Sequence, residues 1–379
     1  MKGAGCVGRG LHPFLSCGQE TCQLRAAPAR LQCPRTTEKR PHMKAVGYKK
    51  PLPINDPESL LDIEIPTPQA SRRDLLVEVK AVSVNPVDVK VRRSAGPDQD
   101  GYKVLGWDAA GIVRQAGPEC SLFKAGDEVY YAGSILRTGT NAEFHVVDER
   151  IVGQKPKALS FAHAAALPLT TITAWELLFD RFGVKRGADG NGDSMLIIGG
   201  AGGVGSMLTQ LARKLTGLHV IATASRPETR QWCLDLGAHE VIDHARPMAE
   251  QLKAVGPAEV KYIASLTATD QHYPGVIDVL APQGKFGLID DPPSLDARPL
   301  KRKAASLVWE FMFTRPLFET PDMIEQHRLL NEVAELIDAG VLRTTFAESF
   351  GRIDASNLKK AHQLIESHKS RGKVVLEGF

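Results

Sequence analysis

The stretch that decides the fold reads Met195-Leu-Ile-Ile-Gly-Gly-Ala-Gly-Gly-Val-Gly-Ser-Met-Leu-Thr-Gln-Leu-Ala-Arg213. Its first four residues form an apolar run, and a cluster of glycines follows. After the glycines, apolar residues recur at helical spacing, at Val204, Leu208, Leu211 and Leu215. The pattern predicts a buried strand, a tight turn and a helix that packs back against the strand.

The glycines of this turn follow the pattern G-x-G-x-x-G, at Gly200, Gly202 and Gly205. We expect the first to allow the sharp turn, the second to let a pyrophosphate approach the backbone, and the third to bring helix and strand close together. The N–H groups at the start of the helix, at Gly203 and Val204, would face the phosphates, whose charge the helix dipole favours. Since a second apolar strand follows one helix later, the setting indicates a dinucleotide site rather than a merely glycine-rich turn.

Length and composition are those of an ordinary globular protein. With 379 residues, the chain is long enough for two or three domains, each with its own core. Apolar residues make up 43% and charged residues 24%, and no apolar run approaches the roughly 18 residues of a membrane span. The net charge is +3, but residues 43–379 hold 40 basic and 42 acidic groups, so this part is near neutral. We therefore expect neither a nucleic-acid partner nor a membrane.

Residues 1–42 differ in character from the rest. They hold seven Lys/Arg, two Glu, four prolines and four of the six cysteines, with no strand or helix period. We expect a disordered extension, and our hypothesis is that Met43 begins the functional protein. The four early cysteines lack the close pairs of a zinc site, apart from a loose match at Cys17 and Cys22. Because only Cys120 and Cys233 lie further on, a reducing, cytoplasmic compartment without a disulfide framework is favoured.

From Met43 to about Ile172 the pattern is one of short strands separated by proline and glycine. Strands are expected at 74–84, 105–113, 126–131 and 142–147. Strands at this spacing predict a small barrel. Residues 161–182 have a helical pattern that is broken at Pro168.

Strands and helices alternate after the glycine turn. We place strands at 195–199, 219–225, 240–243, 260–266 and 284–290, and helices at 203–216, 227–236, 246–254 and 270–281. This alternation predicts an α/β fold with a doubly wound parallel sheet of the Rossmann kind. The tail is expected to add a helix at 323–339, a strand at 344–350, a helix at 355–367 and a closing strand at 373–376.

This order of parts resembles the medium-chain dehydrogenase/reductase superfamily. The likeness is carried by Val82-Ser-Val-Asn-Pro-Val-Asp88, Leu105-Gly-Trp-Asp-Ala-Ala-Gly-Ile-Val113, Lys124-Ala-Gly-Asp-Glu-Val129, Ala164-Ala-Ala-Leu-Pro-Leu169, the glycine turn, Leu236-Gly-Ala238 and Gly372-Lys-Val-Val-Leu376. The resemblance implies a GroES-like catalytic domain over 43–172, a Rossmann domain over 173–315, and a C-terminal part, 316–379, that completes the first domain. It also implies an active site in the cleft between the domains and a homodimer.

The departures from zinc-dependent members of that superfamily concern the metal ligands. Those enzymes place a cysteine where this chain has Asn85, and a Gly-His-Glu where it has Gly106-Trp107-Asp108. Of these residues only Asp108 is of a type that coordinates zinc. Their structural-zinc loop needs four cysteines, whereas this chain has only Cys120 there. Both metal sites are therefore expected to be absent. The likeness is to the zinc-independent quinone oxidoreductase and enoyl-reductase-like branch, although a close homologue can still bear a zinc-type alcohol dehydrogenase label by descent.

The end of the second strand favours NADPH over NADH. Turns that prefer NADH place Asp or Glu about 20 residues past the glycines, on the ribose 2′-OH. This chain has Ala224-Ser-Arg-Pro227 there, without an acid. Ser225 can hydrogen-bond a 2′-phosphate and Arg226 can pair with it, helped by Arg230 one helical turn further. The alternative for Arg226 is a solvated arginine at a helix start.

Without zinc, no Lewis acid polarises an alcohol or a simple ketone, so the acceptor must be activated by conjugation. Quinones and α,β-unsaturated carbonyls meet that requirement. A hydride from the nicotinamide would reach a ring carbon or oxygen, or a β-carbon, and leave an oxyanion. The protein would hold the two partners together and donate hydrogen bonds to that oxygen, and the proton can come from solvent.

Three side chains are candidates for the catalytic site. The Asn85 amide could orient substrate or the nicotinamide ribose, or it could close its own turn. Lys90 could donate to the oxyanion or be a surface lysine, and family members often carry an aromatic residue at its place. Trp107 could form a wall for a flat ring or belong to the core. Asp88 is expected to cap the helix that it begins.

Further residues are expected beside the dinucleotide. Thr173 matches a threonine that contacts the nicotinamide in relatives. Leu266, Thr267 and Leu288 lie where two central strands end, which is where ligands of open α/β sheets bind. The aromatic run within 309–318 is interpreted first as packing between the two domains, and otherwise as cleft lining or a dimer contact.

These features together predict an NADPH-dependent, zinc-independent oxidoreductase that reduces quinones or conjugated carbonyls. Two alternatives stay open. One is a zinc-type alcohol dehydrogenase, and the other is a non-catalytic NADPH-binding protein of the crystallin or sensor kind.

Overall fold

The computed structural model describes residues 41–97, 101–187 and 192–379. The expectations for Cys6, Cys17, Cys22 and Cys33, and for disorder before residue 41, lie outside these residues. Within the described ranges, no helix is both long enough and apolar enough to cross a membrane.

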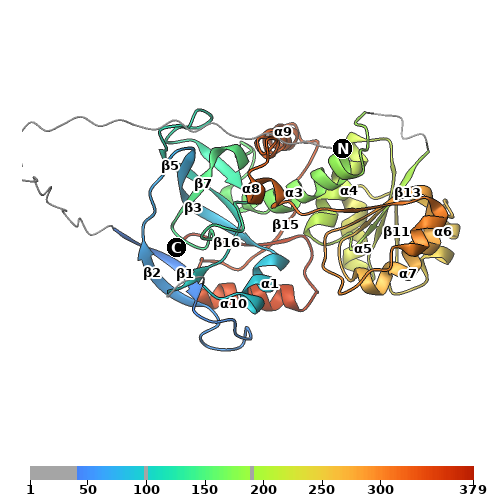
Figure 1. The fold of residues 1–379 in the computed structure, drawn as a ribbon, viewed down its shortest axis with the longest axis horizontal. Helices are drawn as coiled ribbons and strands as arrows, with labels where there is room; N and C mark the ends of the chain where they lie inside the picture. The colour runs from blue at the N-terminus through green and yellow to red at the C-terminus, as the bar shows by residue number, and fades with distance from the viewer. Residues whose placement is uncertain (1–40, 98–100, 188–191) are drawn as a thin grey trace, which may run out of the picture. The chain divides into compact units, whose positions relative to one another are not determined.

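The segment around the glycine turn forms a six-stranded sheet with the order β11-β10-β9-β12-β13-β14, and its neighbouring strands are parallel (Figure 1). The strands are β9 (Ser194–Ile198), β10 (His219–Thr223), β11 (Glu240–Ile242), β12 (Val260–Ser265), β13 (Leu280–Leu288) and β14 (Ser306–Trp309). The helices that connect them are α4 (Gly203–Leu215), α5 (Pro227–Asp235), α6 (Met248–Val255) and α7 (Thr269–Val279). The predicted doubly wound α/β fold is confirmed. The strand order reverses beside β9, which places a topological switch point at the carboxyl end of that strand.

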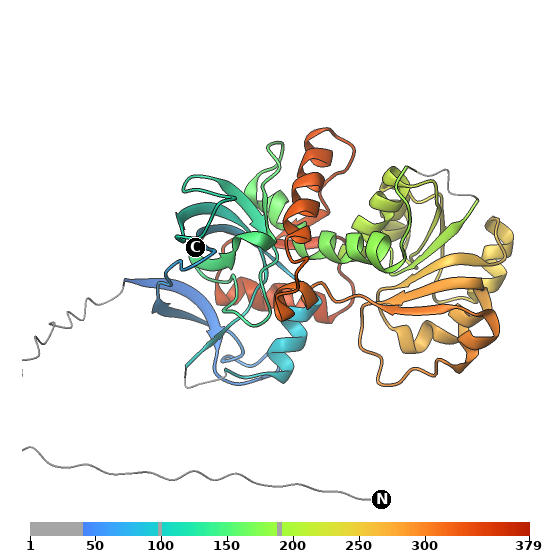
Figure 2. The same cartoon turned by 45° about the horizontal axis from the view of Figure 1, so that its top comes forward.

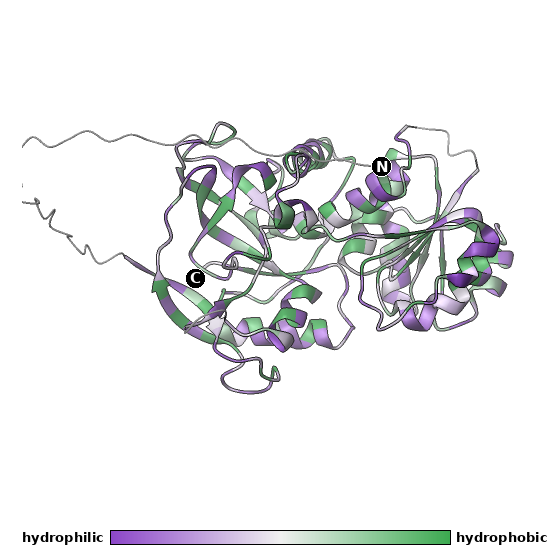
Figure 3. Ribbon diagram, viewed as in Figure 1, coloured by the Kyte–Doolittle hydropathy of each residue, from purple (hydrophilic) through white to green (hydrophobic). Residues whose placement is uncertain are grey.

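The apolar run of β9 serves both faces of this sheet, because successive side chains of a strand point to opposite sides. Met195 and Ile197 belong to the core cluster that includes residues of α4, whereas Leu196 and Ile198 belong to the cluster formed with α6 and α7. Figure 3 shows the strands of this sheet mostly in the green of apolar residues, with purple on the helices around them. A strand that is apolar on both faces is what a parallel sheet covered on both sides requires.

A second large sheet holds strands from both ends of the described chain, in the order β15-β16-β3-β5-β6-β8, with β7 paired to β3. Its strands are β3 (Asp74–Val84), β5 (Asp108–Ala116), β6 (Glu128–Tyr131), β7 (Phe144–Asp148), β8 (Val152–Gln154), β15 (Phe346–Ser349) and β16 (Lys373–Glu377). β16 runs antiparallel to β3, with Val374 opposite Val84. The tail of the chain therefore supplies strands to the sheet that the first half begins.

The remaining elements surround these two sheets. A three-stranded sheet consists of β1 (His42–Tyr48), β2 (Leu61–Pro66) and β4 (Lys103–Val104). Two helices from distant parts of the chain, α1 (Pro86–Ser94) and α10 (Ala355–Glu366), pack together, as Figures 1 and 2 show in cyan and red. The predicted break at Pro168 separates α2 (Phe161–Ala165) from α3 (Pro168–Trp175), which continues as a π-helical segment, η2 (Glu176–Arg181). The short η1 (Glu149–Ile151) and η3 (Arg298–Lys303), together with α8 (Thr314–Phe318) and α9 (Glu325–Asp338), complete the order.

Several element predictions differ from the structure. In the first half of the chain, β1, β2, β4 and β8 were not predicted, and β5 begins three residues after the predicted start at 105. Two further differences lie in the parallel sheet. The apolar segment after residue 306 was not predicted as a strand, yet β14 forms the edge of the parallel sheet. β13 begins at Leu280, four residues before the predicted start. Both differences come from short apolar runs, whose periodicity alone does not separate a strand from a buried helix segment.

Candidate functional site

The glycine turn joins β9 to α4, and close packing requires two of its glycines. A Cβ at Gly200 would lie 2.7 Å from the Cβ of Ala222, and a Cβ at Gly205 would lie 2.4 Å from the Gly199 carbonyl oxygen. The sharp bend expected of Gly200 falls one residue earlier, because Gly199 has the left-handed φ of +85° that glycine tolerates. The Gly199 N–H donates to Thr223 Oγ1 at 3.0 Å, which ties the turn to the end of β10.

Gly202 leaves room for a ligand. A Cβ at this position would meet only the Gly199 oxygen, at 3.5 Å, which is an ordinary contact. Gly202 is the N-cap residue of α4, and no side chain in the described ranges caps this helix. The first N–H groups of α4, at Gly203 and Val204, are therefore available to a phosphate. The residues present fit the pyrophosphate of a dinucleotide.

The end of β12 lies beside the turn, as the sequence predicts. A Cβ at Gly199 would lie 3.1 Å from Thr267 Cγ2, and the Leu266 N–H donates to the Ile198 carbonyl at 3.2 Å. Leu288 ends β13 and is buried. These strand ends meet at the switch point, where a ligand of an open α/β sheet binds.

Two threonines of α3 differ in their position relative to the turn. Thr173 is buried, and its hydroxyl donates to the Leu169 carbonyl at 2.8 Å, within the helix. Thr170 lies closer to the start of α4, since its Cγ2 would be 2.8 Å from a Cβ at Gly203. Sequence reasoning missed Thr170. Only the packing of α3 against α4 shows which face of the helix meets the turn.

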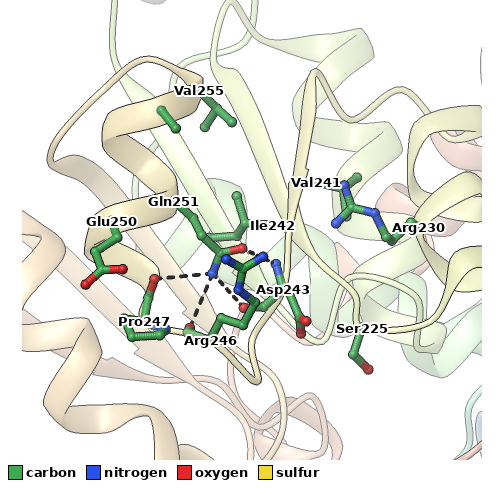
Figure 4. A pocket seen from close by; sticks show the side chains of 11 residues that line it. Ser225, Arg230, Val241, Ile242, Asp243, Arg246, Pro247, Glu250, Gln251 and Val255 are labelled. Carbon is green, nitrogen blue, oxygen red and sulfur yellow. Dashed lines mark hydrogen bonds between the residues drawn. The ribbon is translucent and has the colours of Figure 1, made fainter.

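A cavity of about 540 Å³ lies at the carboxyl ends of β10 and β11 (Figure 4). Ser225, Arg230 and Arg246 line it, and so do the carboxylates of Asp243 and Glu250. A hydroxyl and two guanidinium groups fit a phosphate monoester, whereas a carboxylate fits a ribose hydroxyl. The sequence analysis missed Arg246 because it considered only the end of β10, whereas Arg246 follows β11. The two strands are parallel neighbours, so the residues after each of them lie at the same edge of the sheet.

Arg226 does not line this cavity. One of its Nη atoms donates to the Lys369 carbonyl at 3.0 Å, and its Nε lies 3.3 Å from Glu228 Oε1. It borders a second cavity of about 290 Å³ that Ser225 does not line. The pairing of Arg226 with a 2′-phosphate stays a prediction. Its side chain is 40% exposed and contacts groups outside the cavity, which favours the alternative of a solvated arginine at the helix start.

A buried polar network joins Asn85, Asp108 and Lys373. Lys373 Nζ donates to Asp108 Oδ2 at 3.0 Å, to the Val84 carbonyl at 3.2 Å, and to Asn85 Oδ1. Asn85 Nδ2 donates to Asp108 Oδ2 at 2.8 Å and to the Ser83 carbonyl at 3.3 Å. The amide of Asn85 is therefore engaged in the network on both its oxygen and its nitrogen. Its predicted contact with substrate stays a prediction, and these bonds give it a role in holding neighbouring groups.

Asp88 caps the helix that it begins, as expected. Its Oδ2 accepts from the Asn85 N–H at 2.8 Å, as part of a capping box at the start of α1. Burial, and to a smaller extent the neighbouring Asp108, raise the pKa of Asp88 to about 7, against hydrogen bonding and the charge of Lys373, which lower it.

The other two catalytic candidates occupy different surroundings. Trp107 is 3% exposed, its Nε1 donates to the Ser134 carbonyl at 3.3 Å, and its ring meets Phe313 edge-on at 5.8 Å between centroids. Lys90 is exposed and forms an ion pair with Asp291 at 2.7 Å. These two side chains share none of these partners, and their catalytic roles stay predictions.

The residues at the zinc-ligand positions do not fit a zinc ion. They supply one carboxylate, which already accepts from the Lys373 ammonium, and one amide oxygen, which accepts from the same ammonium. Zinc in proteins is bound by cysteine, histidine and carboxylate side chains. In the described ranges, no group of three or more His, Cys, Asp or Glu residues could hold a metal ion.

The two sheets, the glycine turn and the strand-end cavity are the features of an oxidoreductase fold, and the chain belongs to the medium-chain dehydrogenase/reductase superfamily. The family model for the alcohol dehydrogenase GroES-like domain matches residues 71–157. The family model for zinc-binding dehydrogenases matches residues 236–376. Nicotinamide dinucleotides are the cofactors of this family.

Three known proteins illustrate the similarity. A zinc-type alcohol dehydrogenase-like protein of Staphylococcus epidermidis is 38% identical over 336 residues, which are 88% of this chain and 99% of the relative. A crystal structure from Rhizobium etli, assigned provisionally as a zinc-dependent alcohol dehydrogenase, is 59% identical with a TM-score of 0.87, and the match covers 90% of this chain and 99% of that one. The quinone oxidoreductase of Coxiella burnetii is 26% identical with a TM-score of 0.72, and the match covers 89% of this chain and 100% of that one.

Proposed function

We propose that the protein is an NADPH-dependent oxidoreductase that reduces quinones or α,β-unsaturated carbonyls without a catalytic zinc ion. The observation that carries this proposal is the network of Asn85, Asp108 and Lys373 at the zinc-ligand positions. Because an ammonium group already neutralises the one carboxylate there, no Lewis acid polarises an unactivated carbonyl, and the acceptor must be conjugated. The similarity to a quinone oxidoreductase supports the same class of acceptor.

The cavity at the ends of β10 and β11 supports NADPH as the cofactor. Ser225, Arg230 and Arg246 would hold the 2′-phosphate, while the turn at Gly202 and the start of α4 would hold the pyrophosphate. Leu266 and Thr267, beside the turn, would border the nicotinamide half. When bound, the reduced nicotinamide supplies a hydride to the acceptor. The chain then has to orient the two reactants, exclude water and donate hydrogen bonds to the developing oxyanion.

A substrate screen tests the proposal. We expect metal-free protein, treated with a chelator, to oxidise NADPH with quinones and enones and to leave ethanol and simple ketones unchanged. Metal analysis of the same sample should show less than one zinc ion per chain. Full activity that depends on re-added zinc would contradict the proposal.

A zinc-type alcohol dehydrogenase is the second candidate, and the names of the S. epidermidis and R. etli proteins favour it. It requires stoichiometric zinc and oxidation of an alcohol, which the screen measures directly. The alternative of a non-catalytic NADPH-binding protein requires tight NADPH binding without turnover of any acceptor.

A homodimer is proposed through the edge of the parallel sheet. β14 forms that edge, and three aromatic side chains near it are exposed, Trp309, Phe311 and Phe318. The interpretation of the aromatic run as interdomain packing is wrong for these three, and it fits only Met312 and Phe313, which are buried.

A cytoplasmic location is proposed on the two free cysteines of the described ranges, Cys120 and Cys233.

A further inference from the structure

Lys373 belongs to a segment that contacts the glycine turn as well as the polar network. The Gly372 N–H donates to the Ala201 carbonyl at 2.9 Å, and Gly372 forms a parallel bridge with Gly202. A Cβ at Gly203 would lie 2.9 Å from Lys373 Cδ, so the stem of the lysine lies against the first turn of α4. Two consecutive residues therefore connect the phosphate-binding turn to the Asn85–Asp108 pair.

The positive charge of Lys373 compensates the buried carboxylate of Asp108. Asp108 has no exposed surface, and the Lys373 side chain is 3% exposed. The other donors to Asp108 are neutral, namely the Asn85 amide and the Leu169 N–H at 2.7 Å. An ionised carboxylate buried among neutral groups alone is strongly unfavourable, and a cation in contact offsets that cost. All three N–H donors of the ammonium are used, by Asp108, Asn85 and the Val84 carbonyl.

We propose that the Lys373 ammonium supplies the positive charge of this site, and that it positions both the Asn85–Asp108 pair and the first turn of α4. It bonds to the two side chains, Asn85 and Asp108, that the resemblance aligns with the zinc-ligand region of zinc-dependent members. Lys373 is a positioning residue, because it acts on the dinucleotide through the turn and through Asn85. Loss of the ammonium should therefore weaken dinucleotide binding even when no acceptor is present.

Removal and replacement of the ammonium test this role. Lys373→Ala deletes three methylene carbons and the nitrogen, which is the size of n-propylammonium. We expect the Kd for the dinucleotide, measured by titration of nicotinamide fluorescence, to rise about ten- to a hundredfold, the order expected when a charged hydrogen-bonding group is lost. Added n-propylammonium should restore most of the affinity. Tetramethylammonium, which has no N–H donor, should not.

The matched control is Lys360→Ala, which removes an exposed lysine of α10. Its affinity for the dinucleotide should equal that of the wild type, with or without the amine. Both NADPH and NADH are titrated, and the form that the wild type binds more tightly is used for the comparison.

A double variant covers the case in which Lys373→Ala does not fold. Asp108→Asn with Lys373→Met removes both charges together, which a buried site tolerates better than the loss of one. We expect this variant to fold, to bind the dinucleotide weakly and to be indifferent to n-propylammonium.

Wild-type affinity in either variant would overturn the inference, and so would a folded Lys373→Ala that the amine does not restore. Stoichiometric zinc bound through Asp108 in the wild type would overturn it too. These titrations contain no quinone or enone. A wild type that binds NADPH but reduces nothing would therefore refute the proposed function, while the titrations still decide the role of Lys373.

Discussion

Gly202 and Gly205 lie three residues apart in the same turn, but a methyl group would meet different surroundings at each. At Gly205 a Cβ would lie 2.4 Å from the Gly199 oxygen, whereas at Gly202 it would meet nothing closer than 3.5 Å. The φ of Gly202 is −72°, which alanine adopts without strain. The two glycines therefore serve different purposes, packing at Gly205 and access for a ligand at Gly202.

Alanine substitutions should separate these purposes. We expect Gly205→Ala to lower the free energy of unfolding by about 1–3 kcal/mol, since the backbone of the turn must shift to admit the methyl group. Gly202→Ala should leave the free energy of unfolding within about 0.5 kcal/mol of the wild type. It should nevertheless weaken dinucleotide binding, because the methyl group takes the space of the pyrophosphate. Urea unfolding and a fluorescence titration measure the two effects. Equal loss of stability in both variants would contradict the distinction.

Arg230 and Arg226 offer a second comparison between neighbouring residues. Arg230 lines the cavity with Ser225, while Arg226 is engaged with Lys369 and Glu228 outside it. We expect Arg230→Ala to raise the Kd for NADPH about tenfold or more and to leave the Kd for NADH nearly unchanged, because only NADPH carries the 2′-phosphate. Arg246→Ala should act in the same direction.

Arg226→Ala is the matched control, with a small effect on either cofactor. A large and selective loss of NADPH affinity in Arg226→Ala would instead support the prediction made from the sequence alone. If the wild type prefers NADH, the carboxylate of Asp243 or Glu250 in the same cavity is the group to examine next.

The sequence predicts which types of residue lie at the site better than it predicts which groups their side chains contact. The glycine pattern identified a turn whose packing requires glycine. The absence of zinc that Asn85 and Trp107 indicate stays a prediction. Lys373 gave no comparable signal, since a lysine at the start of an apolar strand has many explanations. Its role depends on the pairing of β16 with β3, which brings together residues 288 positions apart in the sequence.

At the scale of elements, the segment after β14 buries a carboxyl group against η2. Glu310 is 3% exposed and pairs with Arg181 at 2.8 Å. Glu176 of η2 is fully buried, and its Oε1 accepts from Arg315 at 2.7 Å. Glu310 Oε1 and Glu176 Oε2 are buried without any other hydrogen-bond partner, which fits a proton held between them. Burial, and then the charge of Glu176, raise the pKa of Glu310 from 4.5 to about 9.

This pKa predicts a pH dependence of stability. The folded protein keeps a proton on Glu310 that the unfolded chain releases above about pH 4.5. The folded state is thus favoured fully below that pH, and the contribution is lost as the pH rises through about 9. We expect Glu310→Gln, which is neutral at every pH, to show a flatter decline in the free energy of unfolding over this range.

Urea unfolding at several pH values measures this decline. Glu319→Gln, at an exposed position, is the control and should follow the wild type. A wild-type free energy of unfolding that stays level between pH 5 and 9 would be incompatible with a buried, protonated Glu310.

Long periodic elements were predictable, and short edge elements were not. The strand predicted at 74–84 and the helix predicted at 203–216 match β3 and α4 within one residue, because each has a sustained apolar period and clear end signals. β14 has only four residues and one neighbour in the sheet. Its strand conformation follows from pairing with β13, which no local pattern reports.

At the scale of the whole molecule, the edge of the parallel sheet is open. β14 hydrogen-bonds to β13 on one side, and in the described ranges no strand pairs with its other side. Trp309, Phe311 and Phe318 are 51%, 46% and 71% exposed. An exposed strand edge with aromatic residues beside it readily accepts another strand, and a second copy of the same edge satisfies both chains through a two-fold axis.

We therefore expect the wild type to sediment as a dimer in analytical ultracentrifugation. Trp309→Glu combined with Phe311→Glu should yield monomers, because two carboxylates from each chain would meet in the interface. Leu136→Glu is the control. Leu136 is 71% exposed, but it lies in the loop after β6, a strand of the seven-stranded sheet and not of the parallel sheet that β14 ends. This variant should remain a dimer. Since every residue of the proposed NADPH site comes from one chain, the monomeric variant should keep its affinity for NADPH. A wild type that sediments as a monomer would refute the proposed dimer but not the proposed cofactor.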